Sequence, residues 1–192
     1  GDSPRLWVCQ KQKRTISALV RSVTSFLVSV PGSRSSTSAP NILKFGTSSD
    51  VSLEAAKRYK QISEMITFYK CESFIETGTY NGGRAIQMAD TAFEHTDKVT
   101  YTGYDLFGTT TPELNDKEFN SKATNTTEVV VERLTEYALE KAKEGKTFEF
   151  KLIEGDTNET LTGRPKADLV FIDGGHSYAT VSHDYKKLKH NK

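Results

Sequence analysis

Four short strand-like segments, each with an acidic residue at its end or in the turn that follows, constrain the fold of this chain more than any other feature. The segments are residues 73–76, 99–107, 148–153 and 167–173. Glu76, Asp105 and Asp173 lie at the ends of three of them, and Glu154-Gly155-Asp156 follows the third. One acid at a strand end is commonly a turn residue, but ligands of open α/β sheets bind at the carboxyl ends of strands. Acids at all four strand ends therefore predict a ligand site.

The segments between these strands have helical periodicity. Apolar residues recur at three- and four-residue steps over residues 51–69, 82–93 and 128–143, and again in a last helix that carries Tyr178, Val181, Tyr185 and Leu188. Strands that alternate with helices predict an α/β fold with a parallel sheet and flanking helices. Residues 108–126 are polar and long for a connection, which predicts a lid or specificity loop. Asp184, in the last helix, is expected to be solvated.

Charge divides the chain into two parts. Seven of the 26 basic residues but one of the 25 acidic residues lie in residues 1–49, which also contain the run PGSRSSTSAP. We predict a basic, Ser-rich extension and linker over residues 1–49 and a folded domain over residues 50–192. The net charge of +1 argues against a general nucleic-acid-binding surface.

Composition also bears on the compartment. No stretch provides the roughly 20 apolar residues that a membrane-spanning helix needs, so we expect no transmembrane segment. The two cysteines, Cys9 and Cys71, favour a reduced, cytoplasmic chain. The alternative is targeting to an organelle, because an arm rich in Ser and Arg and nearly free of acids is typical of transit peptides.

The turn after the first strand has the sequence ETGTYNGG, from Glu76 to Gly83. Gly78 allows a tight turn and a close approach of backbone to a ligand. Tyr80 occupies the position of the second glycine in the dinucleotide motif G-x-G-x-x-G, which counts against NAD. The pattern E-x-G-x-x-x-G, which includes Gly82, suits a ligand without phosphates, such as S-adenosylmethionine.

Two further strand ends carry candidate binding residues. Asp105 is placed to accept hydrogen bonds from both hydroxyls of a ribose, each worth about 1.5–3 kcal/mol when charge-assisted. A simple cap of the following turn is the alternative. Asp156 and Thr157 lie where an adenine amino group would be recognised, with an ordinary Gly-Asp turn as the alternative.

The string FIDGGHSY, residues 171–178, places Asp173 and His176 after a buried strand. A histidine can take a proton from an acceptor hydroxyl near neutral pH, so His176 is a candidate base. Alternatively, Asp173 and His176 bind Mg²⁺ or another divalent cation that lowers the pKa of the hydroxyl. A purely structural histidine is the third interpretation.

At these motifs the chain resembles class I S-adenosylmethionine-dependent methyltransferases. The similarity covers about residues 51–190 and is greatest to a branch related to macrocin and other sugar O-methyltransferases, in which motifs like FIETGTYNGGRAIQMA and FIDGGHSY are typical. It implies that Asp173 lies beside the transferred methyl group, as a tentative metal ligand, and that His176 is the base. The residues that it assigns to the cofactor are Glu76, Gly78, Asn81, Gly82, Asp105, Asp156 and Thr157.

The resemblance also implies a Rossmann-like sheet with strand order 3-2-1-4 for the first four of seven strands. The sequence stops at Lys192, after the fourth strand, so the later strands are expected to be missing. Segment 167–173 would then form an exposed sheet edge, which is an aggregation hazard. We therefore expect either that the sequence is a piece of a longer chain or that a second copy or another partner covers this edge.

The function predicted from the sequence is methyl transfer to a hydroxyl of a small molecule or sugar. One alternative is an oxidoreductase of similar architecture that binds NAD or another nucleotide. Another is a non-catalytic scaffold whose basic arm binds a partner.

Overall fold

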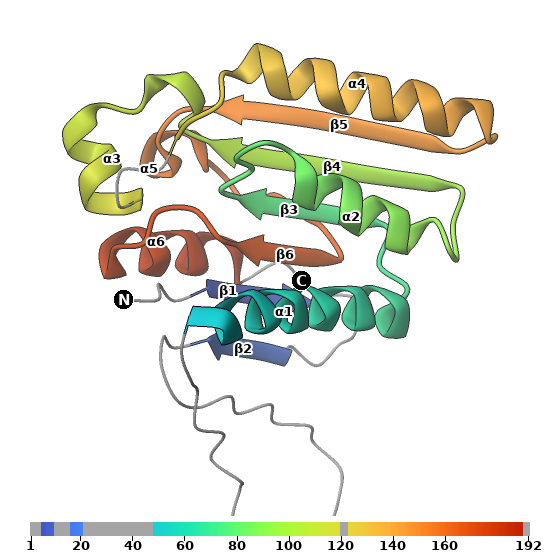
Figure 1. The fold of residues 1–192 in the computed structure, drawn as a ribbon, viewed down its shortest axis with the longest axis horizontal. Coiled ribbons are helices and arrows are strands. Elements are labelled where there is room, and N and C mark those ends of the chain that lie inside the picture. Colours follow the sequence, from blue (N-terminus) through green and yellow to red (C-terminus); the bar gives the residue numbers. More distant parts are fainter. Residues whose placement is uncertain (1–4, 10–15, 21–47, 120–122, 190–192) are drawn as a thin grey trace, which may run out of the picture.

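The computed structural model describes residues 5–9, 16–20, 48–119 and 123–189, and the side chains of residues 59–118 and 123–189. Within these residues, strands form one sheet with the order β2-β1-β6-β3-β4-β5 (Figure 1). The strands are β1 (Arg5–Cys9), β2 (Ile16–Val20), β3 (Ser73–Thr77), β4 (Lys98–Asp105), β5 (Thr147–Glu154) and β6 (Leu169–Ile172). The helices are α1 (Ser48–Tyr69), α2 (Gly83–Ala92), η1 (Phe107–Thr109), α3 (Pro112–Phe119), α4 (Thr127–Lys143), α5 (Thr157–Thr160) and α6 (Tyr178–Leu188).

The four strands predicted from the sequence form the parallel part of the sheet. β3 pairs in parallel with β4 on one side and with β6 on the other, and β4 pairs in parallel with β5. Numbered by their order among the parallel strands, they follow the order 3-2-1-4. The predicted Rossmann-like α/β fold is therefore confirmed.

The prediction that segment 167–173 forms a sheet edge is wrong. β1 runs antiparallel along β6, with Trp7 opposite Phe171, and β2 pairs with β1. The backbone of β1 thus satisfies N–H and C=O groups that β6 would otherwise expose. Two segments of the predicted N-terminal extension belong to the sheet, whereas the run 31–40 lies outside the described residues. A domain division near residue 50 stays a prediction.

Two apolar cores cover the two faces of the sheet. α1, α2 and α4 pack on one face, over side chains such as Phe74, Tyr101 and Phe148. α5 and α6 cover the other face, over side chains such as Ile75 and Ile172. Neighbouring residues of β3 thus point into different cores, as the two-residue period of a strand requires. Strands buried on both faces account for the nearly continuous apolar run of β6.

Residues 108–126 are not a plain loop, because they contain α3 beyond the carboxyl ends of the parallel strands (Figure 1). Pro112 occupies the first position of this helix, where a missing N–H has no cost. The Thr111 hydroxyl accepts a hydrogen bond from the Leu114 N–H (3.2 Å) and so caps the helix. α3 has few apolar residues, so periodicity alone did not predict it.

No helix of the described part of the chain is long and apolar enough to cross a membrane.

Candidate functional site

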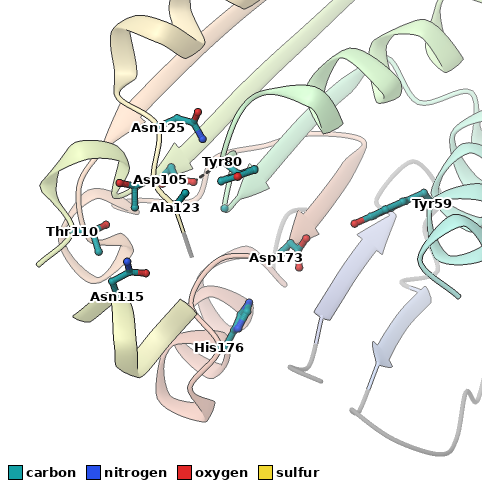
Figure 2. A pocket seen from close by; sticks show the side chains of 11 residues that line it. Tyr59, Tyr80, Asp105, Thr110, Asn115, Ala123, Asn125, Asp173 and His176 are labelled. Atoms are coloured by element: carbon teal, nitrogen blue, oxygen red, sulfur yellow. Dashed lines mark hydrogen bonds between the residues drawn. The ribbon is translucent and has the colours of Figure 1, made fainter. Parts of the chain in front are cut away.

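A cavity of about 330 Å³ lies at the carboxyl ends of β3, β4 and β6 (Figure 2). Four of the predicted site residues, Gly78, Asp105, Asp173 and His176, contribute to its wall. α1 and the segment between β4 and α4 supply much of the rest. The complete lining is Tyr59, Gly78, Tyr80, Asp105, Thr110, Asn115, Ala123, Thr124, Asn125, Asp173 and His176.

Gly78 brings the loop after β3 against the loop after β6. Its φ is +87°, and its N–H donates to the Tyr104 carbonyl (2.8 Å). A Cβ at this position would lie 2.3 Å from the backbone oxygen of Asp173, closer than any real contact allows. Only glycine therefore fits both the backbone conformation and the close approach of the two loops.

Asp105 both caps a turn and lines the cavity. Its Oδ2 accepts a hydrogen bond from the Tyr80 N–H and its Oδ1 accepts one from the Phe107 N–H, each at 2.7 Å. Burial raises the pKa of Asp105, and these backbone hydrogen bonds oppose the rise. Each carboxylate oxygen can accept more than one hydrogen bond, so the carboxylate retains capacity for a ligand.

Glu76 is not among the residues that line the cavity. It is 1% exposed and lies beneath the turn, where the Tyr101 hydroxyl donates to its Oε2 (2.5 Å). The same hydroxyl lies 3.1 Å from the Thr79 Oγ1. Burial raises the pKa of Glu76 well above its ordinary value, and the nearby Asp173 raises it further. Glu76 thus supports the turn from inside the protein, and direct contact with a cofactor stays a prediction.

Asn81 and Gly82 serve the start of α2. The Asn81 Oδ1 accepts a hydrogen bond from the Gly83 N–H (3.0 Å). Gly82 has a φ of +75°, and a Cβ there would lie 3.1 Å from the Leu134 side chain and 3.2 Å from that of Val130. Neither Asn81 nor Gly82 lines the cavity. Their predicted contact with a cofactor is not tested by this geometry.

A smaller hollow of about 50 Å³ shares Gly78 and Asp105 with the cavity. Asp156 and Thr157 line it, and their predicted contact with an adenine stays a prediction. Asp156 also caps α5, because its Oδ1 accepts a hydrogen bond from the Asn158 N–H (2.8 Å). Asp156, like Asp105, therefore caps a turn or helix, and this role leaves room for binding a ligand.

The prediction that Asp184 is solvated is wrong. Asp184 is 1% exposed and lines the smaller hollow, on the face of α6 that also buries Val181 and Leu188. Burial raises the pKa of its carboxyl, and a hydrogen bond from Thr157 opposes the rise. A carboxylate spaced like the core residues of its helix was the signal that sequence reasoning missed.

Asp173 and His176 extend from the loop after β6 toward the larger cavity (Figure 2). The His176 N–H donates to the Glu118 carbonyl of α3 (3.1 Å). Among the residues with described side chains, no group of three or more His, Cys, Asp or Glu could hold a metal ion. Mg²⁺ is commonly held by only one or two carboxylates together with water, so a metal ion bound by Asp173 and His176 stays a prediction.

Sequence reasoning also missed most of the polar and aromatic wall. Tyr59 belongs to the apolar period of residues 51–69, but it lines the cavity and carries the Arg84 guanidinium 3.2 Å from its ring centroid. Tyr80 is half exposed and has a φ of +54°. Asn115 and Asn125 come from the segment predicted as a lid, and neither belongs to a sequence motif.

Comparison with known proteins agrees with this geometry. A family model described as a methyltransferase domain matches residues 75–191, from β3 to beyond α6. This range contains every site residue predicted from the sequence. No curated protein matches the chain. The match spans more than half of the 192 residues and includes the strand ends that form the cavity, so the chain belongs to this family of methyltransferase domains.

Proposed function

We propose that this domain binds S-adenosylmethionine, the usual cofactor of methyltransferase domains, and transfers its methyl group to a hydroxyl oxygen of a small molecule or sugar. The observation that carries the proposal is the shared cavity of Gly78, Asp105, Asp173 and His176. Its volume of about 330 Å³ lies in the range of small-molecule sites.

The charges of the cavity support a cationic cofactor over a phosphorylated one. Asp105 and Asp173 line the cavity, and no lysine or arginine is among its described lining residues. Carboxylates attract a sulfonium and accept hydrogen bonds from ribose hydroxyls, whereas they repel a pyrophosphate. This arrangement counts against the alternative of a NAD-binding oxidoreductase.

The chemistry left to the chain is orientation and proton removal. The methyl carbon loses its bond to sulfur and gains one to the acceptor oxygen, and the acceptor hydroxyl gives up its proton. Reaction requires the acceptor oxygen, the methyl carbon and the sulfur to be held in line. We assign the proton to His176, because its side chain lines the cavity together with that of Asp173. A divalent cation at this site stays a prediction, and the proton transfer proposed for His176 does not depend on one.

Hydroxyl and amide groups of Thr110, Thr124 and Asn125 in the cavity wall support a hydroxylated acceptor, because they donate and accept hydrogen bonds. A sugar is the acceptor that suits such a wall and the sequence resemblance. The cytoplasmic compartment stays a prediction from composition. A second copy or another protein partner, which the sheet edge suggested, also stays a prediction.

The cofactor assignment is tested with Asp105→Asn, which preserves shape and one acceptor oxygen. We expect the affinity for S-adenosylhomocysteine, measured by calorimetry, to fall about tenfold, because a charge-assisted hydrogen bond is lost. His176→Gln should bind within about twofold of the parent, because its role is in proton transfer. Asp97→Ala removes an exposed aspartate at the opposite end of β4 and is the control.

Equal affinity of the parent and Asp105→Asn would contradict the ribose assignment. A thermal-shift comparison of NAD with S-adenosylhomocysteine addresses the alternative. If NAD stabilises the parent and S-adenosylhomocysteine does not, the methyltransferase proposal is wrong and the oxidoreductase alternative is supported.

A further inference from the structure

Glu118 joins α3 to the loop that carries His176. Its side chain is 5% exposed, although glutamate is rarely buried without partners. The Oε2 of Glu118 accepts a hydrogen bond from the Ser177 N–H (2.8 Å), and its backbone carbonyl accepts one from the His176 N–H (3.1 Å). One residue of α3 thus holds two consecutive amides of the loop after β6.

Gly175 makes room for this contact. A Cβ on Gly175 would lie 2.7 Å from the Glu118 Oε2 and 2.8 Å from the Thr180 Cγ2. Its φ is not positive, so backbone conformation does not explain the glycine. The close approach of the Glu118 carboxylate explains why a glycine occupies this position. The second glycine of the FIDGGHSY string therefore serves the contact with α3.

The Glu118 carboxylate also lies at the beginning of α6. Ser177 is the N-cap of this helix, and its side chain accepts a hydrogen bond from the Thr180 N–H (3.3 Å). The first N–H groups of a helix have no partner within the helix and favour a negative charge. Glu118 therefore anchors α3 at a point where a carboxylate is favourable.

The same helix forms part of the cavity wall. Asn115 lies one turn before Glu118 and lines the larger cavity, as does His176 (Figure 2). The Glu118 contacts therefore set the distance between the part of the wall that α3 supplies and the part that carries His176. We propose that Glu118 is a positioning residue, which holds His176 and Asn115 in place around the bound cofactor and acceptor. This inference rests on the proposed function for its role in catalysis, but the contact itself does not.

The test compares Glu118→Ala with Glu118→Gln, because the glutamine retains an oxygen that can accept the Ser177 N–H. Glu113→Ala, an exposed glutamate of the same helix, is the matched control. Hydrogen exchange of the Ser177 amide is followed by NMR in the full chain without ligand. We expect exchange to accelerate about tenfold in Glu118→Ala, at most about threefold in Glu118→Gln, and not in the control.

Two further readouts separate positioning from simple support of the fold. The ring ¹³C–¹H signals of His176 should shift in Glu118→Ala and return toward the parent position in Glu118→Gln. The affinity for S-adenosylhomocysteine should fall about fivefold in Glu118→Ala and be restored to within about twofold in Glu118→Gln.

Unchanged Ser177 exchange in a folded Glu118→Ala would overturn the inference. If Glu118→Ala does not fold, the decision rests on Glu118→Gln. Ser177 exchange, His176 signals and affinity like those of the parent in this variant would support the inference. Disturbed His176 signals together with parent-like Ser177 exchange would overturn it. Faster exchange with unmoved His176 signals would overturn the positioning role. A parent that does not bind S-adenosylhomocysteine would refute the proposed function, while the Ser177 and His176 readouts would still decide the role of Glu118.

Discussion

Asp105 illustrates, at the scale of single residues, how one carboxylate serves the backbone and a ligand together. It accepts two backbone hydrogen bonds, at 2.7 Å each, and still lines the cavity. Asp156 accepts one backbone hydrogen bond at the start of α5 and lines the smaller hollow. The sequence presented capping and binding as alternatives for these residues. The structure makes them compatible, because a carboxylate has more acceptor capacity than two backbone donors use.

The buried Glu76 makes stability depend on pH. Its pKa in the folded protein is raised well above the ordinary 4.5, so the folded state holds the proton more tightly than the unfolded state. The stability that it contributes is fully present below about pH 4.5 and is lost as pH rises through the folded-state pKa. Glu76→Gln retains an acceptor for the Tyr101 hydroxyl but does not titrate. Thermal unfolding should therefore show a smaller loss of stability between pH 4.5 and pH 8 in Glu76→Gln than in the parent.

Glu94→Gln, an exposed substitution in the turn after α2, should leave the pH dependence of the parent unchanged. An identical loss of stability with pH in the parent and in Glu76→Gln would show that Glu76 is not the group responsible.

At the scale of elements, the contact between the loops after β3 and β6 depends on Gly78. Alanine at this position meets a positive φ and a backbone oxygen 2.3 Å from its Cβ. Gly145 also has a positive φ, of +76°, but nothing lies within 4 Å of its Cβ position. Gly145→Ala should therefore lower the free energy of unfolding by only about 1 kcal/mol, the cost of placing a side chain at a positive φ. Gly78→Ala should lower the free energy of unfolding by at least about 3 kcal/mol in urea denaturation, because the two loops must separate.

Similar losses of stability in Gly78→Ala and Gly145→Ala would mean that the two loops can move apart without cost. The close approach would then not explain the glycine of the E-x-G-x-x-x-G turn.

The elements predicted correctly are those whose side chains repeat with a clear period. α1, α2, α4 and α6 follow three- and four-residue steps, and the parallel strands are short apolar runs. α3 has few apolar residues, and α5 is four residues long, so neither has a period to detect. β1 and β2 lie in a region whose charge and serine content indicated an extension. Their strand structure depends on pairing with β6, which is distant in sequence.

At the scale of the whole molecule, β1 gives β6 a partner within the same chain. A chain without residues 1–20 lacks both β1 and β2, so the apolar β6 becomes an exposed edge. We expect this chain to form larger species as its concentration rises, measured by light scattering after size exclusion, because exposed edges pair with other strands. Deletion of residues 1–4 alone is the control, because it leaves both strands in place. A shortened chain that stays monomeric at every concentration would show that β6 needs no cover.

The parallel α/β core and the acids at its strand ends could be predicted from local patterns, because apolar periods and strand–helix alternation are properties of neighbouring residues in the chain. The sequence by itself also predicted that Gly78 marks a special turn. Only the tertiary structure decided that Asp105, Asp173 and His176 share a cavity, that Glu76 supports the turn from beneath, and that Asp184 and Glu118 are buried. The reason is physical: burial and contact depend on which surfaces meet, and those surfaces come from segments as far apart as α3 and the loop before α6.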